Sequence, residues 1–152
     1  MRIKEDKDNK IYWGSVSITS YLFGTTVRGN KDKSVVFKNM MIPSSQVIKE
    51  WSSSYNFQGS RRAPELPLLK RNVEYLLKTR INVIPEKTVF IEIVFKNRFG
   101  EVIGNKITKE NEVVFVYPKD AYFYNVRIMS AGLEEFRFDF IEIDENNSKL
   151  EN

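Results

Sequence analysis

The clearest pattern in the sequence is an alternation of apolar and polar positions with a period of two residues. In Glu74–Val83, one face of an extended chain carries Tyr75, Leu77, Thr79, Ile81 and Val83. The residues between them lie on the other face, which is the pattern of a half-buried strand. Thr88–Lys96 is apolar on both faces apart from Glu92. This second segment therefore predicts a central strand that is covered on both sides.

Other short segments show the same strand pattern and are separated by turn residues. Asn97–Glu101 is predicted to be a turn in which Gly100 takes a positive φ. In the last strand, Phe136, Phe138 and Phe140 are expected on one face. Gln46–Trp51 fits either a strand or a single helical turn. The remaining predicted strands are Ile11–Trp13, Ser20–Gly24, Ser34–Lys38, Val102–Lys106, Glu112–Tyr117, Tyr122–Met129 and Phe136–Ile143.

No window sustains a helical period over three turns, so the pattern predicts an all-β fold, a β-sandwich or jelly roll. A length of 152 residues predicts one domain with a sizeable core. We expect a flexible N-terminus at residues 1–9, a single β-sandwich domain at residues 10–143, and an acidic polar tail at residues 144–152. The charged N-terminus lacks the apolar core of a secretory signal, which predicts a cytoplasmic location.

The chain contains neither cysteine nor histidine. This excludes disulfides, thiol chemistry and histidine-dependent catalysis, and favours a protein that is not an enzyme. Glu92 and Asp139 are the candidate catalytic carboxylates of a glycosidase-like site. The alternative is that both lie on a solvated sheet face or pair with Arg80, Arg98 or Arg127. No phosphate-binding or metal-binding motif is present, so we expect neither a cofactor nor a metal.

Met40–Lys70 is polar, aromatic and interrupted by prolines, with no clear period. Long segments of this kind in compact domains are usually functional or disordered, and this one is too apolar for a disordered linker. We predict that it docks a partner through Trp51, Tyr55, Phe57, Arg61, Arg62 and Leu68, since interface anchors are rich in such residues. Candidate glycan contacts are Trp13, Tyr21, Trp51 and Tyr55, although tryptophan and tyrosine are also common in protein cores.

Charge is distributed unevenly along the chain. Basic residues gather between Arg61 and Arg80, and acidic residues gather from Glu134 to the C-terminus. Such a distribution is typical of an interaction face and a solvated tail, or of ordinary surface charge. Because the net charge is only +4 and the tail is acidic, a nucleic-acid partner is not expected.

Several stretches together resemble one known family. They are SYLFGT (Ser20–Thr25), VVFKNMMIPSSQVIKEW (Val35–Trp51), YNFQGSRRAPELPLLK (Tyr55–Lys70), FKNRFGEVIGN (Phe95–Asn105) and YPKDAYFYNVRIMSAG (Tyr117–Gly132). Their order and spacing resemble the smallest of the three accessory secretory proteins of Gram-positive bacteria, which serve the accessory Sec system.

The resemblance implies a β-sandwich similar to carbohydrate-binding modules, without enzymatic activity of its own. It implies a non-catalytic adaptor that assists export of glycosylated serine-rich repeat adhesins. The implied partners are two larger accessory secretory proteins, the accessory SecA-type motor ATPase and the adhesin substrate, with only indirect contact at the inner face of the membrane. The alternative is a stand-alone carbohydrate-binding module, a lectin for glycoproteins that bear N-acetylglucosamine.

Overall fold

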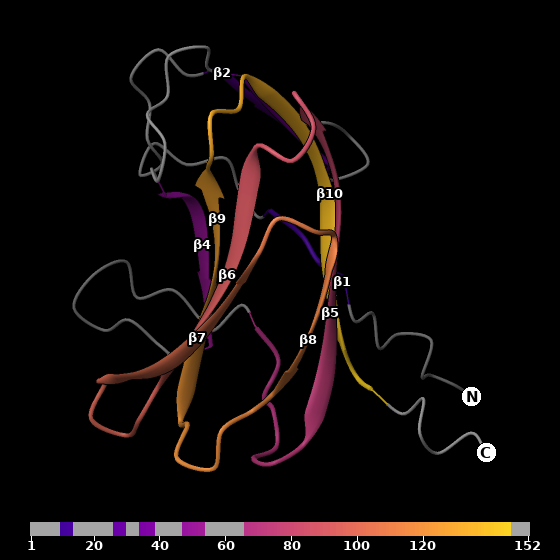
Figure 1. Cartoon of the computed structure of the whole chain (residues 1–152). Coiled ribbons are helices and arrows are strands. Elements are labelled where there is room, and N and C mark those ends of the chain that lie inside the picture. The colour runs from indigo at the N-terminus through magenta and orange to yellow at the C-terminus, as the bar shows by residue number, and fades with distance from the viewer. Residues whose placement is uncertain (1–9, 14–25, 30–33, 39–46, 54–65, 147–152) are drawn as a thin grey trace.

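The computed structural model describes residues 10–13, 26–29, 34–38, 47–53 and 66–146, and within them the chain forms ten strands and no helix (Figure 1). The strands are β1 (Lys10–Ile11), β2 (Thr26–Gly29), β3 (Val35–Lys38), β4 (Val47–Ser52), β5 (Glu74–Ile84), β6 (Val89–Lys96), β7 (Val102–Thr108), β8 (Glu112–Val116), β9 (Phe123–Ser130) and β10 (Glu135–Glu145).

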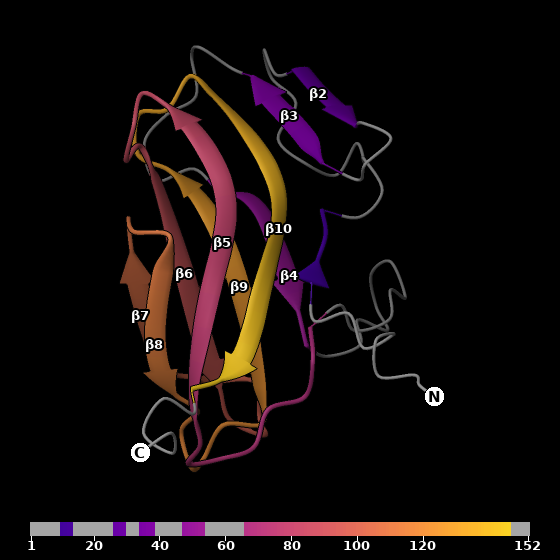
Figure 2. The ribbon, with the colours of Figure 1, turned by 90° about the vertical axis from the view of Figure 1, so that its right-hand side faces the viewer.

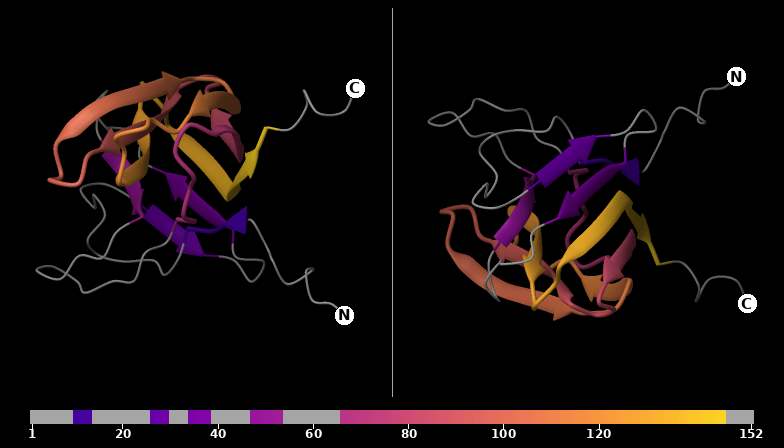
Figure 3. Two further views of the ribbon diagram at one scale, coloured as in Figure 1. Left: turned by 90° about the horizontal axis from the view of Figure 1, so that it is seen from below. Right: turned by 90° about the horizontal axis from the view of Figure 1, so that it is seen from above.

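The strands form two antiparallel sheets that face each other, as the sequence predicts (Figure 1). One sheet has the order β2-β3-β10-β5-β8, with β1 also paired to β10. The other has the order β4-β9-β6-β7. Views along the strands show that β1 to β4 lie on one side of the sandwich, whereas β7 and β8 lie on the opposite side (Figure 3). The N-terminal part of the chain therefore contributes to both layers.

Strand β10 is the centre of the six-stranded sheet. One of its edges pairs with β5 along most of its length, and the other pairs with β3 near Phe136 and with β1 near Ile141 (Figure 2). The register with β5 shifts between Phe138 and Phe140. A bulge of this kind inserts one residue and changes which face the following side chains occupy.

This bulge corrects one expectation from the sequence. Phe136 and Phe138 face the interior as predicted, but Phe140 does not follow them. Ile141 and Ile143 are buried instead, because the inserted residue shifts the alternation by one position. A strict period of two cannot locate such an insertion.

The space between the sheets is filled largely by aromatic rings. Trp13, at the end of the first described segment, lies edge-on against Trp51 of β4, with ring centroids 6.2 Å apart. The Trp51 ring stacks on Phe138 at 5.4 Å, and Phe37 stacks on Phe136 at 5.0 Å. Aromatic pairs at such distances add to the free energy gained from burying apolar area. This cluster joins β4 of one sheet to β3 and β10 of the other.

Tyrosines at the other end of the interior hold the segment before β5. The Tyr124 hydroxyl donates a hydrogen bond to the carbonyl oxygen of Pro67 at 2.6 Å. The Tyr75 hydroxyl accepts one from the backbone N–H of Lys70 at 2.8 Å. Leu66 is buried and its N–H donates to the carbonyl of Ser52. The end of the predicted docking segment is thus fixed to the sandwich.

Most of the predicted strands are present, with boundaries that differ by a few residues. Gln46–Trp51, which fitted two structures, forms β4. Strand β2 was not predicted, and the predicted strand Ser20–Gly24 lies outside the described residues. The last strand continues to Glu145, two residues past the expected domain boundary, and the Asn146 N–H donates to the Glu74 carbonyl. Strand pairing therefore extends into the predicted acidic tail.

Replacing Trp51 is expected to destabilise the fold strongly. Its side chain is completely buried, and its indole N–H donates to the Tyr12 carbonyl at 2.9 Å. Trp51→Ala should lower the free energy of unfolding by about 3–5 kcal/mol, measured by urea denaturation. The control is Leu68→Ala at a site 89% exposed, which should change it by less than about 0.5 kcal/mol. Equal unfolding midpoints for the two variants would contradict this assignment.

Alkaline pH is expected to destabilise the protein through Tyr124. Burial raises the pKa of its phenol far above the ordinary value of 10.0, and the neighbouring Tyr117 and Tyr75 raise it further. Above pH 10 the unfolded chain therefore releases a proton that the folded chain retains, which favours unfolding. Each such group should lower the free energy of unfolding by about 1.4 kcal/mol for every pH unit above 10.

The measurement is urea denaturation between pH 8 and pH 11. Tyr124→Phe should make the alkaline loss of stability shallower, because the group that titrates only on unfolding is gone. Tyr122→Phe, at a ring that is 45% exposed, should leave the slope as in the wild type. Identical slopes for the wild type and Tyr124→Phe would show that this phenol is not the cause.

Candidate functional site

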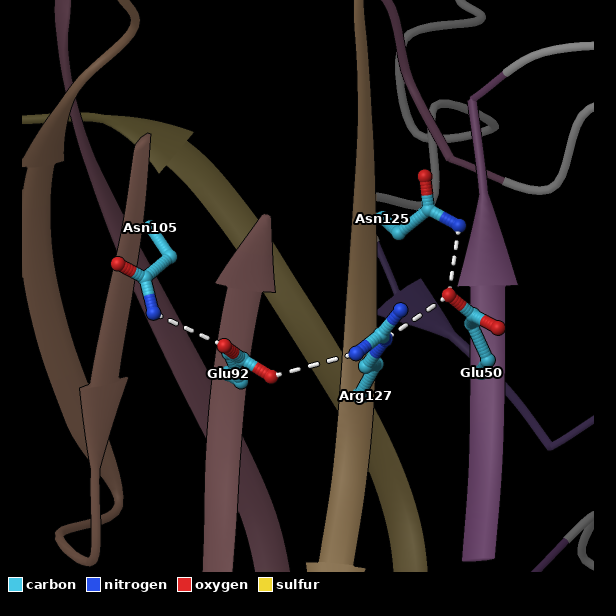
Figure 4. Close-up of polar contacts among 5 residues, drawn as sticks. All are labelled: Glu50, Glu92, Asn105, Asn125 and Arg127. Carbon is cyan, nitrogen blue, oxygen red and sulfur yellow. Dashed lines mark hydrogen bonds and ion pairs between the residues drawn. The ribbon is translucent and has the colours of Figure 1, made fainter. Parts of the chain in front are cut away.

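A row of polar side chains crosses the outer face of the four-stranded sheet (Figure 4). Arg127 of β9 lies at its centre, with Nε 3.0 Å from Oε2 of Glu50 on β4 and Nη1 3.6 Å from Oε1 of Glu92 on β6. Asn125 donates to Glu50 at 2.8 Å, and Asn105 of β7 donates to Glu92 at 2.9 Å. Every strand of this sheet thus contributes at least one side chain.

This polar row links neighbouring strands. Glu92 and Arg127 are directly paired in the sheet register, as are Glu50 and Arg127. Cross-strand pairs of opposite charge typically stabilise a sheet by about 0.2–1 kcal/mol each. The structure therefore agrees with the second interpretation of Glu92, pairing with Arg127. Asp139 is paired with an arginine that was not predicted, since its Oδ1 lies 3.2 Å from Nε of Arg137.

Two further kinds of feature, a metal site and a membrane-spanning helix, were sought among the described residues. No group of three or more acidic side chains in this part of the chain could hold a metal ion. In the same residues, no helix is long and apolar enough to cross a membrane.

A second surface lies at the end of the sandwich where three connections meet. It comprises Leu68, Arg71, Arg98, Phe99 and Tyr122, and we call it the basic aromatic end. The Arg71 guanidinium lies over the Tyr122 ring, with Cζ 4.1 Å from its centroid. Arg98 approaches the same ring at 5.7 Å and the Phe99 ring at 5.6 Å. Leu68 is 89% exposed and Phe99 is 77% exposed.

The basic aromatic end borders a concavity of about 490 Å³. Its lining includes Leu68, Arg71 and Tyr122, together with the buried Tyr117 and Tyr124. Arg71 is held in place because its Nε donates to the Ala121 carbonyl at 2.9 Å. The surface combines apolar, aromatic and cationic groups, a composition typical of protein interfaces.

Trp13 and Trp51 are not where the sequence analysis placed them. Both were candidate glycan contacts, and Trp51 was also a docking candidate, but their exposed fractions are 1% and 0%. The two rings pack against Phe138 between the sheets, so neither can contact a glycan or a partner in this fold. The alternative interpretation, that they are core residues, is correct.

The other predicted site residues differ in what the structure says of them. Leu68 is highly exposed and close to Arg71, so its docking role stays a prediction. Tyr21, Tyr55, Phe57, Arg61 and Arg62 lie outside the described residues.

Arg71, Phe99 and Tyr122 were not predicted as site residues. The turn that carries Arg98 and Phe99 was predicted, and Gly100 has a positive φ, as expected, of 83°. An arginine and a phenylalanine side by side at the tip of a tight turn were the available signal. What the sequence lacked was the proximity of that turn to Arg71 and Tyr122.

Comparison with known proteins identifies the family to which the sequence is similar. Residues 20–145 match a family model that describes accessory secretory protein 3 of the accessory Sec secretory system. The chain is 39% identical to the accessory Sec system protein of that name from Streptococcus gordonii, over 94% of this chain and 96% of that protein.

Solved structures agree with this match. A crystal structure of accessory secretory protein 1, 2 and 3 in Streptococcus pneumoniae contains a chain 40% identical to this one, with a TM-score of 0.86 over 92% of this chain and 97% of that one. In the glycosylation-associated Gap123 complex of Streptococcus agalactiae, a chain is 37% identical, with a TM-score of 0.82 over 90% of this chain and 44% of that one.

More distant structures share only the fold. The carbohydrate-binding module CBM1 of BiXyn10A is 14% identical, with a TM-score of 0.50 over 90% of this chain and 96% of that one. This likeness confirms the predicted β-sandwich of the carbohydrate-binding-module type. The family model and the Streptococcus gordonii relative cover most of the chain, and the chain belongs to the accessory secretory protein 3 family of the accessory Sec secretory system.

Proposed function

We propose that this chain is a non-catalytic adaptor of the accessory Sec system. It assembles with two larger accessory secretory proteins and assists the export of glycosylated serine-rich repeat adhesins. The observation that carries the proposal is the 40% identical chain in the structure of accessory secretory protein 1, 2 and 3, which matches 92% of the present chain. At that similarity, the two chains are expected to share a binding mode.

Two features support a role without catalysis. The sequence has no histidine and no cysteine, the residues that most often act as acid–base or nucleophilic groups. The carboxylates on the outer face of the four-stranded sheet, Glu50 and Glu92, are already engaged by Arg127 and by amide groups. These contacts explain both carboxylates as members of cross-strand pairs that stabilise the sheet.

An adaptor also needs surfaces that can meet other proteins. The accessory SecA-type motor and the adhesin are the further partners that we propose, with the membrane reached only through them. Of the docking residues predicted from sequence, Leu68 is exposed at the basic aromatic end. Tyr55, Phe57, Arg61 and Arg62 remain proposed docking residues, and Tyr21 and Tyr55 remain proposed glycan contacts.

Affinity purification from the native bacterium tests the adaptor function. A tagged full-length chain is expected to recover both larger accessory secretory proteins, because the chain is proposed to bind them directly. The control is the same purification from a strain that expresses an unrelated tagged β-sandwich. Recovery of neither partner above this control would refute the proposal.

The lectin alternative is separated by titration calorimetry. Peptides bearing N-acetylglucosamine on serine are titrated into the isolated chain, with unglycosylated peptides of the same sequence as the control. An adaptor that depends on its partners should give no sugar-dependent heat. Micromolar binding that requires the sugar would favour a stand-alone carbohydrate-binding module.

A further inference from the structure

The basic aromatic end carries positive charge that the described part of the chain does not neutralise. Its connections, residues 66–72, 96–101 and 118–122, hold five cationic side chains and two anionic ones. The cations are Lys70, Arg71, Lys96, Arg98 and Lys119. Among the described residues, neither Arg71 nor Arg98 lies in an ion pair, whereas Lys70 is 4.0 Å from Glu145.

The two arginines are held in place by groups other than carboxylates. Arg71 stacks on the Tyr122 ring and donates through Nε to a backbone carbonyl. Its other guanidinium N–H groups make no hydrogen bond within the described residues. Arg98 lies near two aromatic rings. An arginine that is stacked in this way keeps N–H donors available, and its planar fork matches a carboxylate.

The turn that carries Arg98 and Phe99 is held by hydrogen bonds within it. The side-chain oxygen of Asn97 accepts hydrogen bonds from the N–H groups of Phe99 and Glu101, both at 2.9 Å. The Asn97 amide also donates to the Glu101 carboxylate at 2.8 Å. Tyr122 is fixed as well, because its N–H donates to the Lys96 carbonyl at 2.8 Å. A preorganised surface loses little entropy on binding, which favours affinity.

Exposed apolar groups surround these cations. Phe99 and Leu68 are among the most exposed large apolar side chains of the described residues. Arg71 covers one face of the Tyr122 ring at 4.1 Å, so that face cannot stack on a pyranose. A surface with aromatic and apolar groups around arginines suits an acidic protein segment that carries its own apolar side chain.

We propose that the basic aromatic end docks an acidic segment of one of the two larger accessory secretory proteins. Carboxylates of that segment bind Arg71 and Arg98, and a neighbouring apolar side chain enters the concavity beside Leu68 and Tyr122. This inference rests on the proposed adaptor function, since it names the surface through which the complex forms.

The test is binding of the full-length chain to its two co-expressed partners, measured by biolayer interferometry at several salt concentrations. Arg71→Glu combined with Arg98→Glu is expected to weaken binding on the order of 100-fold, because attraction to the acidic segment becomes repulsion. Wild-type affinity should fall as salt rises, since ions screen exposed charges. The double variant should lose most of that salt dependence.

The matched control reverses the same number of charges elsewhere. Lys106 on β7 and Lys109 just after it are both exposed, and Lys106→Glu with Lys109→Glu should bind within about twofold of the wild type. Phe99→Ala removes an exposed ring without a change of charge, and should weaken binding about tenfold if this ring is an anchor. Urea denaturation of all variants checks that folding is intact.

The outcomes separate this inference from the proposed function. If the wild type binds and both charge-reversal variants bind equally well, this surface is not the docking site and the adaptor function stands. If both variants lose binding equally, net charge alone is responsible and the inference fails. If the folded wild type binds neither partner, the adaptor function itself fails. Binding of the wild type and of the Arg71→Glu, Arg98→Glu variant to anionic phospholipid vesicles is measured in parallel. If the variant loses binding to the vesicles but still binds its partners like the wild type, this surface meets a membrane and the inference is overturned.

Discussion

The packing of Trp13 and Trp51 against Phe138 is the interaction on which the rest of the fold depends. These rings come from the first segment, from β4 and from β10, so they tie the N-terminal third of the chain to both sheets. Large aromatic side chains stabilise a core through buried area and through ring geometry. In a sandwich without disulfides, this packing acts together with the pairing of β1 and β3 with β10, and of β4 with β9, to join early and late parts of the chain.

The same packing decides which surfaces remain for function. Because both tryptophans are buried, the aromatic groups available for recognition within the described residues are rings such as Phe99 and Tyr122, at one end of the sandwich. The polar row centred on Arg127 links neighbouring strands of the four-stranded sheet through ion pairs. The recognition surface that we propose is therefore formed by the connections at the end of the strands, which the scaffold holds in place.

Much of the fold could be predicted from the sequence, and the exceptions have physical causes. The alternation in β5 and β9 follows from one buried face, so a period of two locates these strands. The bulge in β10 could not be predicted, since the inserted residue depends on the pairing of β10 with β5. Strand β2 was missed because its sequence, TVRG, has a single large apolar residue and so shows no alternation, although it pairs with the next strand along the chain, β3.

For the candidate site, the sequence determined less. It determined a β-sandwich, the absence of histidine and cysteine chemistry, and a turn at Asn97–Glu101, because these depend on composition, periodicity and local turn chemistry. It could not determine that Trp51 is buried or that Arg71, Arg98 and Tyr122 meet, since those residues are separated by up to about fifty positions. Only the tertiary structure decided these points, because strand pairing and side-chain packing between the sheets bring distant residues together.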